Sequence, residues 1–186
     1  MRSPSDLLWA VIGLLLTIFG TFVEAFATAP PWDWLSAGLE PHSLGVRLQV
    51  GGVLFVGCLG GPQAAVISQI AYLGLGLAGM PIFESGGGLR YVLEPTFGYL
   101  LGFIPGSWVC GRLAFGRSPS LEWLALACGA GLATLHAVGL SYLVLTRAGN
   151  AAAAALTYSV APLPGQLAIA CAVAVIAAVL RQVLLY

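Results

Sequence analysis

Long apolar runs constrain this chain more than any other feature of its sequence. Hydrophobic residues make up 59% of the chain and charged residues only 8%, whereas about a quarter of the residues in soluble domains are charged. A helix needs about 20 mostly apolar residues to cross a bilayer, and lipid offers no water to unpaired backbone groups. The runs are therefore predicted to be transmembrane helices.

Six runs fit membrane spans of this kind. The first is followed by Pro30 and Pro31, through which a helix does not easily continue. A Gly-Gly-Pro sequence separates the second run from the third and predicts a tight turn between antiparallel helices. The sequence therefore predicts an all-α integral membrane protein, a single domain over 1–186 that forms a compact bundle of six transmembrane helices. The expected spans are 7–27, 44–59, 63–79, 96–115, 121–145 and 166–185.

An even number of spans places both termini on one side of the membrane. If that side is the cytoplasm, four arginines fall in inner segments and three in outer ones, a small excess in the direction of the positive-inside rule. We therefore expect a protein of the plasma (inner) membrane with cytoplasmic termini. The inner arginines are Arg2, Arg112, Arg117 and Arg181, and the outer ones are Arg47, Arg90 and Arg147.

Charge and motif content exclude several classes of function. The chain has no lysine and a formal net charge of zero, which argues against a nucleic-acid partner. No nucleophile-elbow, zinc-protease or P-loop motif occurs, and no predicted span holds a pair of carboxylates. We therefore do not expect an enzyme.

The cysteines and histidines do not form a recognisable metal motif. The four cysteines lie singly in apolar sequence without a C-x-x-C pair, so we interpret them as packing residues and expect no metal ion and no cofactor. His136 lies within a predicted span, where an ionisable group is a candidate functional residue. We interpret it instead as a neutral imidazole bonded to a neighbouring helix. The cysteines are Cys58, Cys110, Cys128 and Cys171.

Small residues recur at helical spacing in the fourth predicted span. Gly98, Gly102 and Gly106 are four residues apart and share one face of a helix. In lipid, such faces allow the close backbone contact on which helix packing depends. The stripe predicts either packing within the bundle or a docking surface for another membrane subunit.

The stretch MPIFESGGGLRYVLEP at 80–95 interrupts the apolar sequence between the third and fourth spans. It is too rich in polar residues and glycine to span, and too apolar for a free linker. We therefore predict a re-entrant glycine-rich loop that folds back into the bundle. Its glycines, 86–88, can take positive φ and bring backbone amides close to a ligand. An apolar wall with a cation and a few polar groups suits a small organic acid.

Two glutamines are predicted to lie at the level of this loop. Gln49 is near the start of the second span and Gln166 at the start of the sixth. Each is interpreted either as a helix-to-helix hydrogen bond or as a ligand contact, because a polar group there is costly without a partner. Together with the loop they define a candidate binding site. Its predicted residues are Gln49, Phe83, Ser85, Gly86, Gly87, Arg90, Glu94, Thr96, Tyr99 and Gln166.

Three sequence pieces in this region resemble a known family. They are LQVGGVL at 48–54, GMPIF at 79–83 and PTFGYLLGF at 95–103. Their order and spacing are similar to those of BioY, the family of substrate-binding membrane subunits of biotin transporters in the energy-coupling factor (ECF) class. The resemblance covers residues 44–111 and extends more weakly to PLPGQ at 162–166.

The resemblance implies a six-helix subunit that sits in membrane lipid and captures biotin from outside the cell. A transmembrane coupling subunit and a pair of ATPase subunits would supply the energy, which agrees with the lack of a nucleotide-binding motif in this chain. It also identifies the glycine-rich loop, including Ser85 and Arg90, as the family's ligand loop.

Two departures from the family pattern bear on the ligand and the partner. Where the family often has Asp and Lys before its last helix, this chain has Gln166 and Ile169, so Arg90 or another outer arginine would have to replace the lysine charge. In place of the docking patch A-x-x-x-A of related subunits, the first span has Gly13 and Thr17. The alternatives are a related subunit for another small vitamin-like ligand, a self-sufficient small-molecule membrane transporter, and a membrane enzyme.

Overall fold

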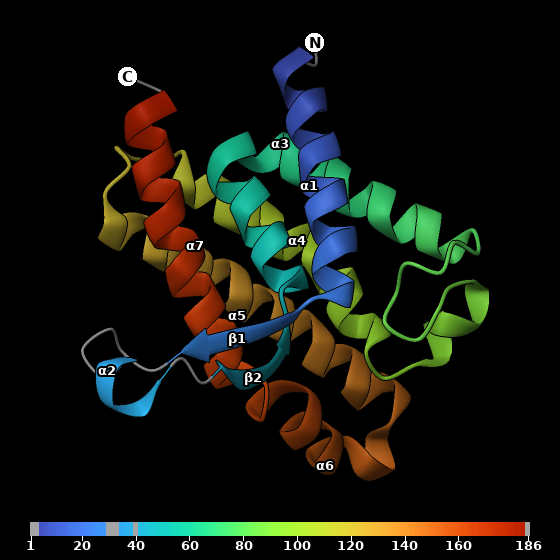
Figure 1. The fold of residues 1–186 in the computed structure, drawn as a ribbon. Coiled ribbons are helices and arrows are strands. Elements are labelled where there is room, and N and C mark those ends of the chain that lie inside the picture. The colour runs from blue at the N-terminus through green and yellow to red at the C-terminus, as the bar shows by residue number, and fades with distance from the viewer. Residues whose placement is uncertain (1–3, 29–33, 39–40, 185–186) are drawn as a thin grey trace.

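The computed structural model describes residues 4–28, 34–38 and 41–184, and most of them are helical. Both described ends of the chain lie at the same end of the bundle (Figure 1). The long helices are α1 (Pro4–Phe22), α3 (Gln49–Leu77), α4 (Phe97–Ala114), α5 (Leu121–Thr146) and α7 (Leu163–Leu184). The shorter elements are β1 (Glu24–Thr28), α2 (Trp34–Ala37), β2 (Pro41–Arg47), η2 (Leu89–Leu93), η3 (Ala148–Asn150), α6 (Ala151–Ala155) and η4 (Leu156–Val160).

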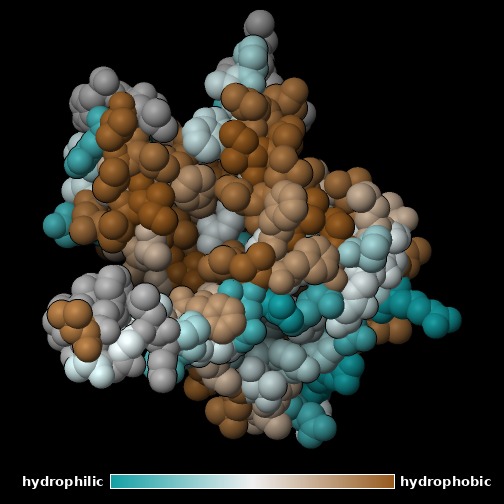
Figure 2. Space-filling view, viewed as in Figure 1, coloured by the Kyte–Doolittle hydropathy of each residue, from teal (hydrophilic) through white to brown (hydrophobic). Residues whose placement is uncertain are grey.

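Four helical segments of the described chain are long and apolar enough to cross a membrane. Hydrophobic side chains cover much of α1 and α7, and hydrophilic ones gather toward the end of the molecule that carries the strands (Figure 2). Phe19 on α1 is 65% exposed, an arrangement that suits contact with lipid. The four segments are Pro4–Phe22, Gln49–Leu77, Leu121–Thr146 and Ala151–Val183.

Helix α3 is broken where the sequence predicts a turn. Gly61 has φ 80° and ψ 175°, a backbone conformation that favours glycine, and Pro62 follows it. The second arm of α3 folds back beside the first. The Gln49 side chain, at the start of the first arm, donates a hydrogen bond to the hydroxyl of Tyr72 in the second arm at 2.7 Å. The break predicted at 60–62 is therefore confirmed.

A two-stranded antiparallel sheet replaces the helix ends predicted around 27 and 44. Helix α1 ends at Phe22, and β1 pairs with β2 so that Glu24 lies opposite Arg47. The helical prediction was wrong there because an apolar run of this length is compatible with either a helix or a strand. Pairing satisfies backbone N–H and C=O groups of both segments. The fold is therefore mainly, but not wholly, α-helical.

Small residues hold α1 against α3. A Cβ at Gly13 would lie 2.7 Å from a Val56 side-chain carbon, and one at Gly20 would lie 2.7 Å from the backbone nitrogen of Gln49. Thr17, between the two glycines, is fully buried, and its hydroxyl donates to the Gly13 carbonyl at 2.8 Å. The residues that stand in place of the family's docking patch therefore face α3.

The glycine stripe of α4 faces α5. A Cβ at Gly102 would lie 2.7 Å from the Leu135 carbonyl oxygen, and one at Gly106 would lie 2.9 Å from the Gly131 carbonyl oxygen. At Gly98 a Cβ would collide with the Tyr142 side chain. Of the two interpretations of this stripe, the structure supports packing within the bundle.

The last long helix begins earlier than predicted. Helix α7 starts at Leu163 rather than Gln166, since Pro164 is compatible with the first turn of a helix. The preceding residues, 151–160, form α6 and the π-helical η4. This short helical segment folds across the end of the bundle (Figure 1) and brings Tyr158 and Ser159 toward α4 and α5.

Candidate functional site

A small cavity lies beneath the loop at 78–96, which joins α3 to α4. Its volume is about 110 Å³. Six of its lining side chains carry a polar group and two are apolar, the combination expected of a site that orients a small ligand. The lining residues are Gln49, Glu84, Tyr91, Thr96, Tyr99, Leu100, Phe103 and Tyr158.

Tyr72 fixes one wall of the cavity through hydrogen bonds. Its hydroxyl accepts a hydrogen bond from Gln49 Nε2 and donates to the Ile82 carbonyl at 3.0 Å. The Thr21 hydroxyl lies 3.2 Å from the same oxygen. The bonds connect α1, both arms of α3 and the loop, so the Gln49 side chain enters the cavity wall in a defined orientation.

Glycines allow the loop to fold onto the end of α3. Gly86 and Gly88 have φ of 111° and 94°, and the Gly88 amide donates to the Gly76 carbonyl at 2.7 Å. A Cβ at Gly87 would collide with the Met80 carbonyl. The close backbone approach predicted for these glycines is therefore made to the chain itself.

Aromatic rings anchor the loop in the core. Phe83 is 1% exposed and packs against Tyr72 and Tyr91, with ring centroids 5.3 and 4.6 Å away. The Tyr91 hydroxyl lies 3.2 Å from Thr96 Oγ1. Burial raises the pKa of Tyr91, so its hydroxyl keeps its proton and can donate or accept a hydrogen bond at the cavity.

A chain of hydrogen bonds runs from the cavity to α7. The Tyr99 hydroxyl lies 2.6 Å from Ser159 Oγ, which lies 3.1 Å from His136 Nδ1. His136 Nε2 lies 2.6 Å from Gln166 Oε1. An amide oxygen only accepts, so Nε2 carries a proton and donates it to Gln166. Nδ1 of the same ring bonds the Ser159 hydroxyl, which in turn bonds the Tyr99 hydroxyl.

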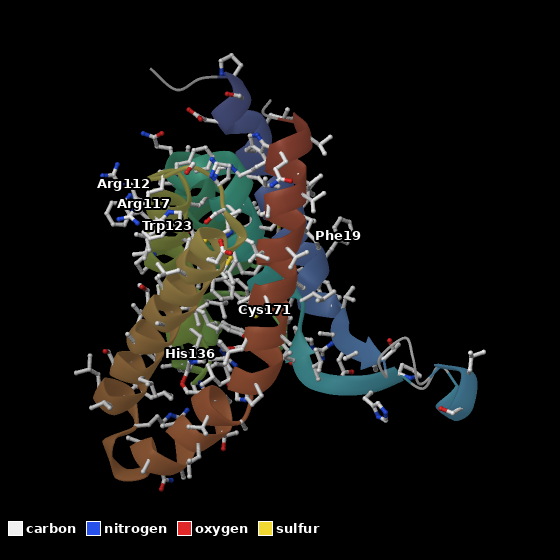
Figure 3. The ribbon with its side chains drawn as sticks, turned by 90° about the vertical axis from the view of Figure 1, so that its left-hand side faces the viewer. Phe19, Arg112, Arg117, Trp123, His136 and Cys171 are labelled. Atoms are coloured by element: carbon white, nitrogen blue, oxygen red, sulfur yellow. The ribbon has the colours of Figure 1, made fainter. Side chains whose placement is uncertain are left out.

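This network confirms that His136 and Gln166 bond between helices. His136 lies in the half of the bundle away from Arg112 and Arg117 (Figure 3). Gln166 contacts the imidazole and is not among the residues that line the cavity. The structure therefore supports the interpretation of Gln166 as a helix-to-helix hydrogen bond. Gln166 is connected to the cavity through His136, Ser159 and Tyr99.

Replacing Ser159 with alanine is expected to destabilise the protein. The change removes the hydroxyl between Tyr99 and His136 and leaves each of these buried groups short of a partner, at a cost of about 1–3 kcal/mol. Thermal unfolding in detergent would measure it. Ser141→Ala is the matched control, because Ser141 is exposed and bonds only its own helix. Equal stability of the two variants would contradict the network.

The three arginines that the sequence predicts on the outer side all lie near the loop. Arg47 pairs with Glu84 at 3.4 Å, with side chains 43% and 53% exposed. Arg147 Nη2 donates to the Leu93 carbonyl at 3.2 Å. Arg90 lies on η2 and is exposed. None of the three lines the cavity, so a cation would reach a ligand there only from the rim.

The predicted site residues other than Gln166 divide into three groups. Gln49, Thr96 and Tyr99 line the cavity together. Phe83, Gly86 and Gly87 shape the loop, whereas Ser85, Arg90 and Glu94 are exposed on it. Five lining residues were not predicted from the sequence: Glu84, Tyr91, Leu100, Phe103 and Tyr158. For Tyr158, the polar run Thr157–Ser159 beside an alanine tract was the available signal.

A larger groove between α1, α3 and α7 is a weaker candidate for ligand binding. Its volume is about 590 Å³, and the space-filling view shows a hollow between α1 and α7 (Figure 2). All its lining residues are apolar or glycine. Recognition of a polar small molecule needs a few fixed polar groups, which the smaller cavity supplies and this groove lacks.

Fold and cavity together define the class of the molecule. It is a multi-pass membrane protein with a polar cavity under a loop, an arrangement suited to holding a small molecule. The sequence profile of the BioY family matches residues 3–185. The chain belongs to the BioY family.

Individual relatives agree with this assignment. A protein of Lysinibacillus sphaericus named "Probable biotin transporter BioY" is 42% identical over 143 residues, which cover 76% of this chain and 66% of the relative. The "Biotin transporter BioY" of Rhizobium etli is 30% identical over 161 residues, covering 82% of this chain and 83% of the relative. The chain thus spans just under two thirds of the first relative's length and most of the second's.

A solved structure shares the fold. The crystal structure of the S-component for biotin from an ECF-type ABC transporter superposes with a TM-score of 0.71. The superposition covers 98% of this chain and 95% of the other, at 22% sequence identity. The likeness at this identity concerns the fold.

Proposed function

We propose that this chain is the biotin-binding membrane subunit, or S component, of an ECF-type transporter, and that it mediates biotin uptake. The observation that carries the proposal is the family match over 3–185. Relatives of this chain are named as biotin transporters. The chain is accordingly a component of a transporter and not an enzyme. Biotin is the ligand carried, and no cofactor has a part in the proposal.

The chemistry of the cavity supports biotin as the ligand. Biotin has a neutral ureido ring, an apolar thioether ring and chain, and one carboxylate. Amide and hydroxyl groups of Gln49, Thr96 and Tyr99 can both donate and accept hydrogen bonds, as a ureido ring requires. Leu100 and Phe103 offer apolar contact. The carboxylate then points to the rim, where the arginines lie.

The loop must move to admit this ligand. Ligand pockets usually have volumes of about 300 Å³ or more, and the cavity has about 110 Å³. The loop is the least regular part of the wall and carries Glu84 and Tyr91 into it. We therefore assign it the role of a re-entrant lid that opens at the outer face and closes over biotin.

The proposed topology has six membrane segments: α1, the two arms of α3, α4, α5 and α7. The break at Gly61 supports counting α3 twice. Arg112 and Arg117 lie toward the end of the bundle that carries both termini (Figures 1 and 3), as the positive-inside rule expects of a cytoplasmic face. We propose that this end is cytoplasmic in the plasma membrane and that the cavity lies toward the outside.

The proposed partners are a transmembrane coupling subunit and a pair of ATPase subunits. Uptake of labelled biotin by biotin-requiring cells that lack their own transporter would test this division of labour. The chain expressed together with such a module should support uptake well above that of the chain alone. Equal uptake without any module would favour a self-sufficient transporter instead.

Arg90→Gln is expected to weaken biotin binding by about 1.5–3 kcal/mol, the range for a hydrogen bond to a charged group. The reason is the proposed contact between the Arg90 guanidinium and the carboxylate of biotin. A biotin amide lacks that charge and should lose far less affinity. Titration calorimetry of the purified variant with both ligands would measure the difference.

Arg47→Gln is the matched control for this experiment. Arg47 is already paired with Glu84, and an exposed pair of this kind contributes little. If Arg90→Gln loses equal affinity for biotin and for the amide, Arg90 does not contact the carboxylate. A loss confined to the acid in Arg47→Gln would assign the contact to Arg47.

A further inference from the structure

Three cysteines that are far apart in the sequence meet in the core. The Cys58 sulfur lies 3.6 Å from that of Cys110 and 3.5 Å from that of Cys128, and all three sulfurs lie within 4.8 Å of one another. Each side chain is 0% exposed. The residues come from α3, α4 and α5, so one thiol is supplied by each of three helices.

This cysteine cluster lies away from the ligand cavity. Cys58 is three residues before the break at Gly61, and Cys110 is near the end of α4. Two glycines leave room for the Cys110 side chain. A Cβ at Gly57 would lie 3.1 Å from the Cys110 sulfur, and one at Gly131 would lie 2.9 Å from Cys110 Cβ. The cluster therefore belongs to the end of the bundle that carries the termini.

We propose that Cys58, Cys110 and Cys128 bind one soft, thiophilic metal ion, Cu(I), in three-sulfur coordination. Metal–sulfur bonds of about 2.3 Å around a trigonal ion place the sulfurs about 4 Å apart, so the observed triangle needs only small shifts. Soft thiolate ligands favour Cu(I), zinc and iron–sulfur clusters. Structural zinc sites and iron–sulfur clusters take four protein ligands, and among the described residues no His, Asp or Glu joins this cluster, so Cu(I) is the ion that three sulfurs suit.

A buried arginine offsets part of the charge of such a site. Cysteine binds a metal ion as the thiolate, so Cu(I) with three thiolates carries two negative charges, which are costly in an apolar interior. Arg181 is buried, within electrostatic reach of Cys58, and its guanidinium donates to the Ala114 carbonyl at 2.7 Å. The guanidinium offsets one of the two charges. Binding forms three copper–sulfur bonds, releases three thiol protons to the solvent and transfers no electron.

The test uses the purified full-length chain in detergent under anaerobic conditions. Cu(I) is supplied from a chromogenic Cu(I) chelator, and uptake is measured by the loss of chelator colour and by metal analysis. Wild type is expected to take one Cu(I) per chain. Cys58→Ser and Cys128→Ser should bind Cu(I) at least about tenfold more weakly. Even the loss of a group that only hydrogen-bonds to a metal ligand often lowers metal affinity by that factor.

Cys171→Ser is the matched control, because Cys171 is the exposed cysteine of α7 (Figure 3). It should bind as wild type does. Unchanged uptake in Cys58→Ser, loss of uptake in Cys171→Ser, or no uptake by folded wild type would overturn the proposal. X-ray absorption of the wild-type copper complex gives a readout that needs no variant. Three sulfur neighbours are expected, and a shell of nitrogen or oxygen would also overturn it.

Discussion

Valine at position 87 is expected to displace the loop and reduce biotin affinity by roughly 30- to 1,000-fold, or about 2–4 kcal/mol. Its side chain would collide with the Met80 carbonyl and crowd the Gly76 carbonyl, to which the Gly88 amide is bonded. Moving the loop breaks several such hydrogen bonds, each contributing about 1 kcal/mol. Equilibrium binding of labelled biotin to Gly87→Val would measure the loss.

Gly74→Val provides the control for this change. Gly74 lies on α3 near the loop, and a Cβ there would meet nothing within 4 Å. This variant introduces the same valine side chain near the loop without a collision, so it should bind biotin nearly as wild type does. Wild-type affinity in Gly87→Val would show that the loop position does not govern binding.

Gly102→Leu is expected to lower the free energy of unfolding by about 1–3 kcal/mol or more, the cost of overpacking a close contact. Gly102 lies where α4 meets the backbone of α5, and a Cβ added at Gly102 would lie 3.0 Å from the Cα of Leu135. Backbone cannot move aside as a flexible side chain can. Chemical or thermal unfolding of the purified chain would show the loss.

Gly129→Leu separates this contact from a general effect of replacing a helical glycine. Gly129 lies on α5, and nothing lies within 4 Å of a Cβ there. The control should therefore be close to wild type in stability. Equal stability of Gly102→Leu and Gly129→Leu would mean that the α4 stripe does not pack against α5 in the membrane.

Helix positions and breaks were predictable because their signals are local. Apolar runs indicate buried or lipid-facing helices, and the Gly-Gly-Pro sequence carries its own backbone preference, seen at Gly61. The β-hairpin was not predictable in this way. The residues of β1 are as apolar as a helix, and the partner that makes them a strand lies in β2, beyond α2.

The candidate site depended on contacts between distant segments. Gln49, Thr96 and Tyr99 were identified because each stands at the end of an apolar run or beside the glycine-rich loop. Ser159 reaches Tyr99 and His136 only after the 151–160 segment folds across the bundle. No local pattern encodes that meeting, so a polar side chain within a span remains the best available signal.

Biotin binding to the purified chain in detergent decides whether this chain is a biotin-binding subunit. We expect saturable binding of one biotin per chain, and no comparable binding of other vitamins. Thermal unfolding of the same sample should show a folded protein that biotin stabilises, because a ligand that binds the folded state alone raises its stability. A folded chain that does not retain biotin, or that binds another vitamin more tightly, would show that biotin is not its ligand.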